Sequence, residues 1–323
     1  MKKRLTAEPL PRGKRSRERL THYVAAQHCD ETVRRYVAAA LADNTLRAYR
    51  ADLKHFFAWG GAIPDSPEHV ALYIARHATC LAVSTLSRRL VAIDCAHAAR
   101  GLASPTKSEL VRATLQGVRR SQRRGVRQVA PLQKMQILQM VARLKGLRGL
   151  RDRALLLIGF ASALRRSELV SLDVEDVRFS DDGAVIRVRR SKTDQEGRGR
   201  DIAIPRVRAR HCPCRTLLRW LQAAGITAGP IFRRVDRYDH LLPQRLSAQS
   251  VALIVKQRAS EAGLDPREFS GHSLRAGFAT SAAKGGASPS SIRAQTGHTS
   301  DAMLQRYIRN SQLFTDNPNL KIW

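Results

Sequence analysis

Four short segments in the second half of the chain carry side chains that could act on a phosphate group. They are Ala163-Leu164-Arg165-Arg166-Ser167-Glu168-Leu169, Ser191-Lys192-Thr193, His272-Ser273-Leu274-Arg275 and Thr296-Gly297-His298-Thr299-Ser300, and Tyr307 follows the last of them. His272 and Arg275 are three residues apart, so they would share one face of a helix. Each segment alone is common in proteins, and only the ordered set predicts a site.

Together these residue types supply what metal-free phosphoryl transfer to a protein hydroxyl requires. Two guanidinium groups can bind the non-bridging oxygens of a phosphodiester and stabilise a pentavalent transition state. Two imidazoles can hydrogen-bond phosphate oxygens or move a proton, and a lysine can protonate the leaving oxygen. The nucleophile would be the phenol of Tyr307. Its free pKa is about 10, so a cationic pocket that favours the phenolate would activate it.

The order Arg, Lys, His-x-x-Arg, His, Tyr within these segments resembles the catalytic signature of the tyrosine recombinases, the phage and plasmid integrases. The stretch N-T-L-R-A-Y-R-A-D-L at residues 44–53 resembles the start of that family's helical core-binding domain. The resemblance extends from about Tyr23 to the C-terminus.

The resemblance implies that Arg165 and Arg275 bind the scissile phosphate and that Lys192 is the general acid for the 5′-oxygen. Tyr307 would attack the phosphate, leaving a 3′-phosphotyrosyl link and a free 5′-hydroxyl. A 5′-hydroxyl of a partner duplex would then reverse the step. Because one phosphodiester is exchanged for another, the family's reaction implies neither ATP nor a metal, and no cofactor is expected.

The same resemblance assigns the remaining polar positions. His272 would be a proton acceptor or phosphate ligand, and His298 the second phosphate ligand. Glu168 matches an acidic position that supports the site and is not the chemical base. Two departures touch no reacting group: Ser162-Ala163 stands where Thr-Gly is commoner, and Thr296 stands where Leu is commoner.

Two other classes of function remain open at this point. A type IB DNA topoisomerase uses similar Tyr, Arg, Lys and His groups, although the compact N-terminal helical region and the second histidine in T-G-H favour a recombinase. An architectural or regulatory DNA-binding protein with a degenerate site is the non-enzymatic alternative, and the occupied catalytic positions argue against it.

The composition supports a nucleic-acid partner. The 323 residues include 57 Lys and Arg against 27 Asp and Glu, a formal net charge of +30, with an ordinary hydrophobic fraction of 43%. A folded chain with this surplus favours a polyanion. No long apolar stretch predicts a membrane span, and five scattered cysteines fit a reducing cytoplasm better than a disulfide scaffold.

The residues ahead of the four segments predict a small all-α bundle. From Asp43 onward apolar residues recur at three- and four-residue steps, with Asn44 as a plausible N-cap and Gly60-Gly61 as the stop. Further helices are expected at 67–78, 83–100 and 107–122.

The second half is predicted to be mixed. Helices are expected at 132–144, 150–163, 214–224, 248–262, 273–284 and 300–310. Val185, Ile186 and Val188 are expected to pair with Ile202 and Ile204 in a β-hairpin whose polar tip carries Lys192.

The expected fold is therefore mainly α (α+β). The resemblance implies an all-α, SAM-like core-binding domain at 21–122, and a mostly helical catalytic domain with a small antiparallel β-sheet at 132–323. Residues 1–20 would form a basic tail, and 123–131 a basic linker lying against a polyanion.

Several basic residues of the helical bundle are expected to contact DNA phosphates, which position a duplex without reading its sequence. They are Arg47, Arg50, Lys54, Arg88 and Arg89. By contrast, His211-Cys212-Pro213-Cys214 offers only three candidate metal ligands, so we interpret it as an irregular helix start and expect no metal site.

The expected partner is double-stranded DNA with short inverted-repeat recombination sites, bound by a homotetramer across two sites in the cytoplasm, at the nucleoid, with no membrane partner. The tail after Tyr307 carries Leu313, Phe314, Leu320, Ile322 and Trp323. These could fold back onto their own domain. We favour docking on a neighbouring protomer, because the resemblance implies that such segments often exchange and a cyclic exchange closes a ring.

Overall fold

The computed structural model describes residues 30–32, 35–36, 43–122, 129–189, 199–297 and 318–322. The chain divides into two compact units, Met1–Arg127 and Gln128–Trp323, called the first and second unit below. The basic tail expected at 1–20, most of the linker and the helix expected at 300–310 lie outside the described residues. No helix in the described part of the chain is long and apolar enough to cross a membrane.

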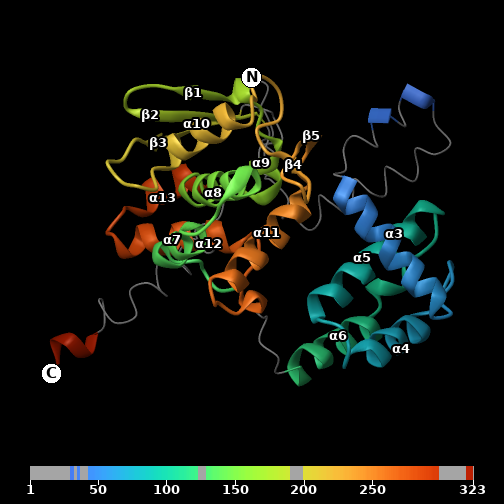
Figure 1. The fold of residues 1–323 in the computed structure, drawn as a ribbon. Coiled ribbons are helices and arrows are strands. Elements are labelled where there is room, and N and C mark those ends of the chain that lie inside the picture. Colours follow the sequence, from blue (N-terminus) through green and yellow to red (C-terminus); the bar gives the residue numbers. More distant parts are fainter. Residues whose placement is uncertain are drawn as a thin grey trace, which may run out of the picture. The chain divides into compact units, whose positions relative to one another are not determined.

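The first unit is a bundle of α-helices over its described residues (Figure 1). Its helices are α3 (Asp43–Ala58), α4 (Pro67–His77), α5 (Val83–Ala99) and α6 (Glu109–Ser121), with a short 3₁₀ turn, η2 (Pro105–Lys107), before α6. Helix α3 packs against α5, and α4 packs against α6. Their apolar faces enclose a core that includes Phe56, Tyr73, Ile74, Leu86 and Ile93.

Local sequence signals explain where two of these helices begin. The hydroxyl of Ser66 accepts a hydrogen bond from the His69 N–H, and Pro67 occupies the first helical position of α4. The hydroxyl of Ser108 likewise accepts from the Val111 N–H at the start of α6. These caps satisfy backbone donors that have no partner within the helix.

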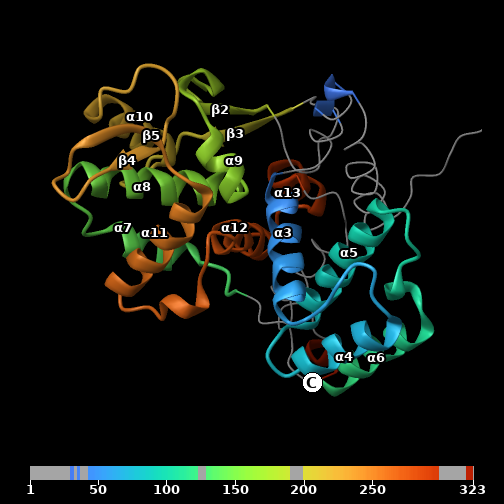
Figure 2. The same ribbon diagram turned by 90° about the vertical axis from the view of Figure 1, so that its right-hand side faces the viewer.

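The second unit is built around α8 (Gly146–Ala161), a helix buried over most of its length. Figures 1 and 2 show α10 (Pro213–Ala223) on one side of α8, and α7 (Lys134–Val141) and α12 (Ser273–Lys284) on the other. The other helices are α9 (Arg166–Ser171), α11 (Ala248–Glu261) and α13 (Pro289–Thr296), with 3₁₀ turns η3 (Val174–Asp176), η4 (Pro266–Glu268) and η5 (Pro318–Lys321). Helix α8 is thus held by helices on both sides, and its last residue leads into the segment that carries Arg165.

Two small antiparallel sheets complete the second unit. β1 (Val177–Phe179), β2 (Gly183–Val188) and β3 (Arg200–Pro205) form one sheet in that order, and β4 (Arg233–Val235) pairs with β5 (Leu241–Arg245). Ile186 lies opposite Ile202, which confirms the hairpin expected from the alternating apolar residues. The fold class expected from the sequence is therefore confirmed.

A buried ion-pair cluster ties α8 to α11. Asp152 is fully buried and accepts hydrogen bonds from Arg151 and from Arg258 of α11. Since a buried carboxylate is stable only when it is paired, these contacts hold the two helices in one arrangement.

Candidate active site

Arg165 follows α8 directly and begins α9. A turn of Ser162, Ala163 and Leu164, all buried, joins the last residue of α8 to Arg165, which is the N-cap of α9. Ala163 has a φ of 52°. This left-handed conformation costs a residue with a Cβ about 1–2 kcal/mol, so the turn is held by its surroundings. It fixes the point from which the Arg165 side chain leaves the backbone.

Glu168 contacts both the backbone and the side chain of Arg165. Its carboxylate accepts a hydrogen bond from the Arg165 backbone N–H at 3.0 Å and pairs with Arg165 Nη1 at 2.5 Å. Glu168 is only 4% exposed, so water weakens this ion pair little. Because both carboxylate oxygens contact Arg165, the arrangement suits a supporting role for Glu168.

His272 and Arg275 lie at the start of α12. His272 is the N-cap residue and is exposed, whereas Arg275 is 2% exposed. Arg275 Nη1 donates hydrogen bonds to the carbonyl oxygen of Ala163, at 2.9 Å, and to that of Thr296. Its guanidinium group therefore joins the α8–α9 turn to the end of α13.

The guanidinium groups of Arg165 and Arg275 meet at the C-terminal end of α13. Arg165 Nη2 donates to the Gly297 carbonyl at 3.5 Å, and Arg275 Nη1 donates to the preceding carbonyl, that of Thr296. Carbonyl groups at a helix C-terminus lack helical partners and carry partial negative charge, so they orient cations. The structure thus brings together four of the predicted site residues, Arg165, Glu168, His272 and Arg275.

The environment keeps His272 neutral. Partial desolvation of the ring, together with the nearby positive charges of Arg275 and Arg165, lowers the pKa of His272 below its ordinary value of 6.5. All three causes disfavour the imidazolium form. A neutral imidazole can accept a proton or a hydrogen bond, as the predicted role of His272 requires.

This pKa predicts how DNA cleavage depends on pH. Because the pKa of His272 is lowered below 6.5, the part of the cleavage rate that depends on neutral His272 should fall to half of its plateau only below pH 6.5. Single-turnover cleavage measured between pH 5 and pH 8 tests this. His272→Gln, which does not titrate, should lack the acidic limb. An inflection above pH 6.5 that disappears in His272→Gln would contradict the prediction.

Lys192, His298 and Tyr307 lie outside the described residues. Their positions in the sequence nevertheless tie them to described elements. Lys192 belongs to the segment between β2 and β3, and His298 directly follows Gly297. Their expected roles stay predictions.

The second unit contains two tyrosines, Tyr238 and Tyr307. Tyr238 is 65% exposed on the turn between β4 and β5, beside Asp239, whose carboxylate accepts hydrogen bonds from backbone N–H groups at the start of α8. Arg165 follows the opposite end of α8, and a helix of 16 residues is about 24 Å long. Tyr238 is therefore too remote from Arg165 to attack a phosphate that Arg165 binds.

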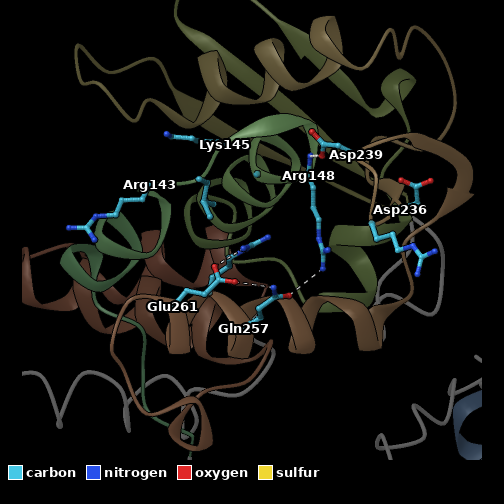
Figure 3. Close-up of a pocket in the computed structure, with 11 residues that line it drawn as sticks. Arg143, Lys145, Arg148, Asp236, Asp239, Gln257 and Glu261 are labelled. Atoms are coloured by element: carbon cyan, nitrogen blue, oxygen red, sulfur yellow. Dashed lines mark hydrogen bonds and ion pairs between the residues drawn. The ribbon is translucent and has the colours of Figure 1, made fainter.

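A cavity of about 350 Å³ also lies at the start of α8 (Figure 3). Figure 3 shows Arg148 extending toward Gln257 of α11, whose Oε1 atom is 3.4 Å from Arg148 Nη2. Two acidic side chains that line the cavity, Asp239 and Glu261, accept hydrogen bonds from neighbouring protein donors. The cavity is lined by none of the predicted site residues, so it is separate from the candidate active site.

Three of the residues expected to contact DNA lie exposed on α3: Arg47, Arg50 and Lys54. Arg88 of α5 is also partly exposed, but its guanidinium makes two hydrogen bonds to Asp52 of α3, at 2.7 and 2.9 Å. Arg88 therefore ties α5 to α3, and part of its charge is neutralised.

Arg89 requires a correction, because it lies inside the first unit. It is 8% exposed, and its Nη1 atom is 2.8 Å from the Tyr73 hydroxyl and 2.9 Å from His55 Nδ1. Burial, followed by the charges of Arg89 and His77, lowers the pKa of His55, which is then free to accept this hydrogen bond. The buried Arg89 organises the polar core and is not placed to bind a phosphate.

The H-C-P-C segment leads into α10. Cys212 is the N-cap residue and Pro213 the first helical residue. Both Cys212 and Cys214 are buried free thiols, and the Cys214 thiol donates to the Ile204 carbonyl at 3.0 Å. Burial raises the pKa of Cys214 to about 11, so this thiol stays protonated at neutral pH.

Known proteins resemble this chain over most of its length. The family model described as the phage integrase family matches residues 131–313. The "integrase/recombinase xerD homolog" of Selenomonas ruminantium is 44% identical over 262 residues, covering 79% of this chain and 76% of that protein.

Solved structures share the fold. The Tn1549 transposon integrase in complex with transposon right end DNA superposes with a TM-score of 0.62 at 14% identity, covering 89% of this chain and 94% of that chain. A lambda integrase tetramer bound to a Holliday junction gives a TM-score of 0.60 at 18% identity, with coverages of 90% and 76%.

The family match covers more than half of the chain, and the curated relative matches 79% of it. The match includes Arg165, Arg275 and the segment that carries Tyr307. This chain belongs to the phage integrase family, the tyrosine-type site-specific recombinases.

Proposed function

We propose that this recombinase cleaves and rejoins duplex DNA through a covalent 3′-phosphotyrosyl intermediate on Tyr307. The observation that carries the proposal is the meeting of Arg165 and Arg275 at the end of α13, directly before His298 in the sequence. Two guanidinium groups from different elements provide the donors that a phosphodiester needs in its transition state.

The proposed reaction is a balanced exchange of phosphodiesters. The Tyr307 oxygen forms a bond to phosphorus while the bond from phosphorus to the 5′-oxygen breaks. The phenolic proton passes to His272 or solvent, and Lys192 donates a proton to the leaving 5′-oxygen. The reverse step, with a 5′-hydroxyl of the partner duplex, releases Tyr307. Because the number of phosphodiesters is conserved, the cycle needs no ATP, and the cationic groups take the place that a metal ion would have.

We also propose that basic side chains of the first unit bind the phosphates of the DNA duplex. Arg47, Arg50 and Lys54 are exposed on one helix and would contact phosphates, with Arg88 contributing less because of its pairing to Asp52. The domain boundaries 21–122 and 132–323, joined by a basic linker, stay part of this proposal.

The proposed assembly is a homotetramer on two DNA sites made of short inverted repeats, acting in the cytoplasm at the nucleoid. The lambda integrase tetramer on a Holliday junction, which shares this fold, supports the tetramer. Exchange of the C-terminal tail between protomers would close such a ring.

A trapping experiment tests the function. DNA fragments bound by the chain in bacterial cells are mapped, and the mapped site is rebuilt as a duplex with a nick close to the expected cleavage position. We expect a covalent protein–DNA adduct to accumulate without ATP and in the presence of EDTA, because the short cleaved strand diffuses away and prevents religation.

The same site-bearing duplex distinguishes the alternatives. A plasmid without the mapped site should not be relaxed, whereas a type IB topoisomerase would relax it. Tight binding of the mapped site with no adduct would contradict the proposal and favour an architectural DNA-binding protein.

A further inference from the structure

Arg200 makes an unusual set of contacts with the end of α13. It is the first residue of β3, and its side chain is 21% exposed. Its Nη1 atom donates to the carbonyl of Gln295 at 2.7 Å and to that of Ala294 at 3.3 Å, and Nη2 lies 3.5 Å from the carbonyl of Thr296. One guanidinium group therefore binds the last three carbonyls of the helix.

Arg200 also lies against Gly297, the residue that ends α13. A Cβ atom added to Gly297 would be 3.0 Å from both Cζ and Nε of Arg200, which is closer than ordinary packing allows. Gly297 also has a φ of 63°, a conformation that favours glycine. The guanidinium group of Arg200 can therefore pack this closely on Gly297 only because residue 297 has no side chain.

The same guanidinium group reaches the support of Arg165. Arg200 Nη2 is 3.7 Å from Glu168 Oε2, and Glu168 pairs with Arg165. Arg165 and Arg275 themselves bind the carbonyls of Gly297 and Thr296. Three arginines from three elements therefore surround two consecutive residues of the chain, directly before His298.

Few apolar contacts hold α13 apart from those with α12. Its buried apolar residue, Ile292, belongs to a small cluster with Ala279 and Ala283 of α12, separate from the main core of the second unit. Toward β3 and the end of α8 the contacts are polar: those of Arg200, and those of Gln295 Nε2 with the carbonyls of Ala203 and Ala161. Loss of Arg200 would thus shift α13 while the main core stays folded.

We infer that Arg200 is a positioning residue of the proposed cleavage reaction: it fixes the end of α13 against Glu168, Arg165 and Arg275, and so aligns the phosphate-binding guanidiniums. This inference rests on the proposed function. Arg200 acts through the residues that it holds: its Nη groups contact the carbonyls of Gln295 and Thr296 and lie beside Glu168, the partner of Arg165. A displacement of about 1 Å at a reacting centre can lower a rate about 10²-fold.

Arg200→Met and Arg200→Lys test the inference on the nicked duplex that carries the mapped site. For Arg200→Met we expect the single-turnover cleavage rate at saturating DNA to fall about 10²-fold, while the half-saturating DNA concentration changes less than about three-fold. Arg200→Lys keeps the charge but not the planar fork, so it should recover part of the rate. Arg178→Met removes an exposed arginine from β1 of the same sheet and should cleave normally.

A modified substrate distinguishes an effect on the positions of Arg165 and Arg275 from an effect on proton donation to the leaving group. When sulfur replaces the 5′-bridging oxygen, the leaving thiolate needs no general acid. We expect this substrate to restore cleavage by Lys192→Ala but not by Arg200→Met. Restoration of Arg200→Met would overturn the inference, because Arg200 would then act through the general acid.

Two further results would overturn the inference while leaving the proposed function intact. The first is a rate within two-fold of wild type for Arg200→Met. The second is a parallel loss of rate, DNA affinity and thermal stability in both variants, which would indicate misfolding alone. Failure of the wild-type chain to form any adduct would overturn the proposed function itself, and the inference with it.

Discussion

Tyr307→Phe is expected to bind the mapped DNA site with unchanged affinity and to form no covalent adduct. The substitution keeps the aromatic ring and removes only the oxygen that would bond to phosphorus. Loss of a nucleophile lowers turnover about 10⁴-fold or more, because the other groups cannot replace the bond-forming atom. Denaturing gel electrophoresis of the nicked duplex after incubation measures the adduct, and a filter-binding or gel-shift titration measures affinity.

Tyr238→Phe is the matched control. It removes the same oxygen from the other tyrosine of the second unit, at the remote end of α8, and should cleave at the wild-type rate. The polarity of the link provides a second check, since a 3′-phosphotyrosyl bond leaves a 5′-hydroxyl that polynucleotide kinase can label. An adduct that persists in Tyr307→Phe would assign the nucleophile to another residue.

The sequence predicted most helices close to their observed positions. The helices expected at 67–78, 83–100 and 273–284 occur at Pro67–His77, Val83–Ala99 and Ser273–Lys284. The helix expected at 132–144 is shorter, Lys134–Val141, and the one expected at 150–163 begins earlier and ends at Ala161. Ends vary because capping, and not the buried face, decides them.

Elements with a weak apolar pattern were not predicted. α13 is one example: within Pro289–Thr296 only Ile292 is a buried apolar side chain, so no periodicity indicates a helix. α9 and the pair of β4 and β5 are short and gain their stability from the rest of the unit. Such segments are set by tertiary contacts, which a single sequence does not display.

Burial of arginines was the hardest feature to predict. Arg88 and Arg89 are neighbours in sequence, and helical geometry points adjacent side chains in different directions. One is therefore partly exposed and the other lies against Tyr73. The charge surplus alone placed both on the surface, and only the packed structure separates them.

The sequence contains one indication that the Arg200 side chain points inward, namely its alternation with apolar residues of the same strand. Arg200 occupies the same alternating register as Ile202 and Ile204, whose side chains are buried, so strand geometry turns it inward. An inward arginine at the start of a strand requires acceptors, and the carbonyls at the end of α13 supply them. The backbone at Ala163 has a positive φ, which is a physical reason for glycine to be commoner at this position; nothing in the structure explains the alanine found here.

Arg275→Ala is expected to lower the single-turnover cleavage rate about 10³-fold or more, the effect of removing a cation that stabilises a phosphoryl transition state. Stability should fall as well. Arg275 is 2% exposed and donates to the carbonyls of Ala163 and Thr296, and a buried polar group left without a partner costs about 1–3 kcal/mol. The unfolding temperature should therefore decrease by several degrees, on the order of 2–4 °C per kcal/mol for a domain of this size.

The two effects of Arg275→Ala can be separated because Arg233 of β4 makes similar structural contacts elsewhere. Arg233 donates to the carbonyls of Pro230 and Ala228, at 3.0 and 2.6 Å, and belongs to no part of the site. Arg233→Ala should lower the unfolding temperature and leave the cleavage rate of the folded protein unchanged. If Arg275→Ala lost no more than ten-fold in rate at a temperature where both variants are folded, Arg275 would be a structural residue. A cation other than Arg275 would then have to bind the scissile phosphate together with Arg165.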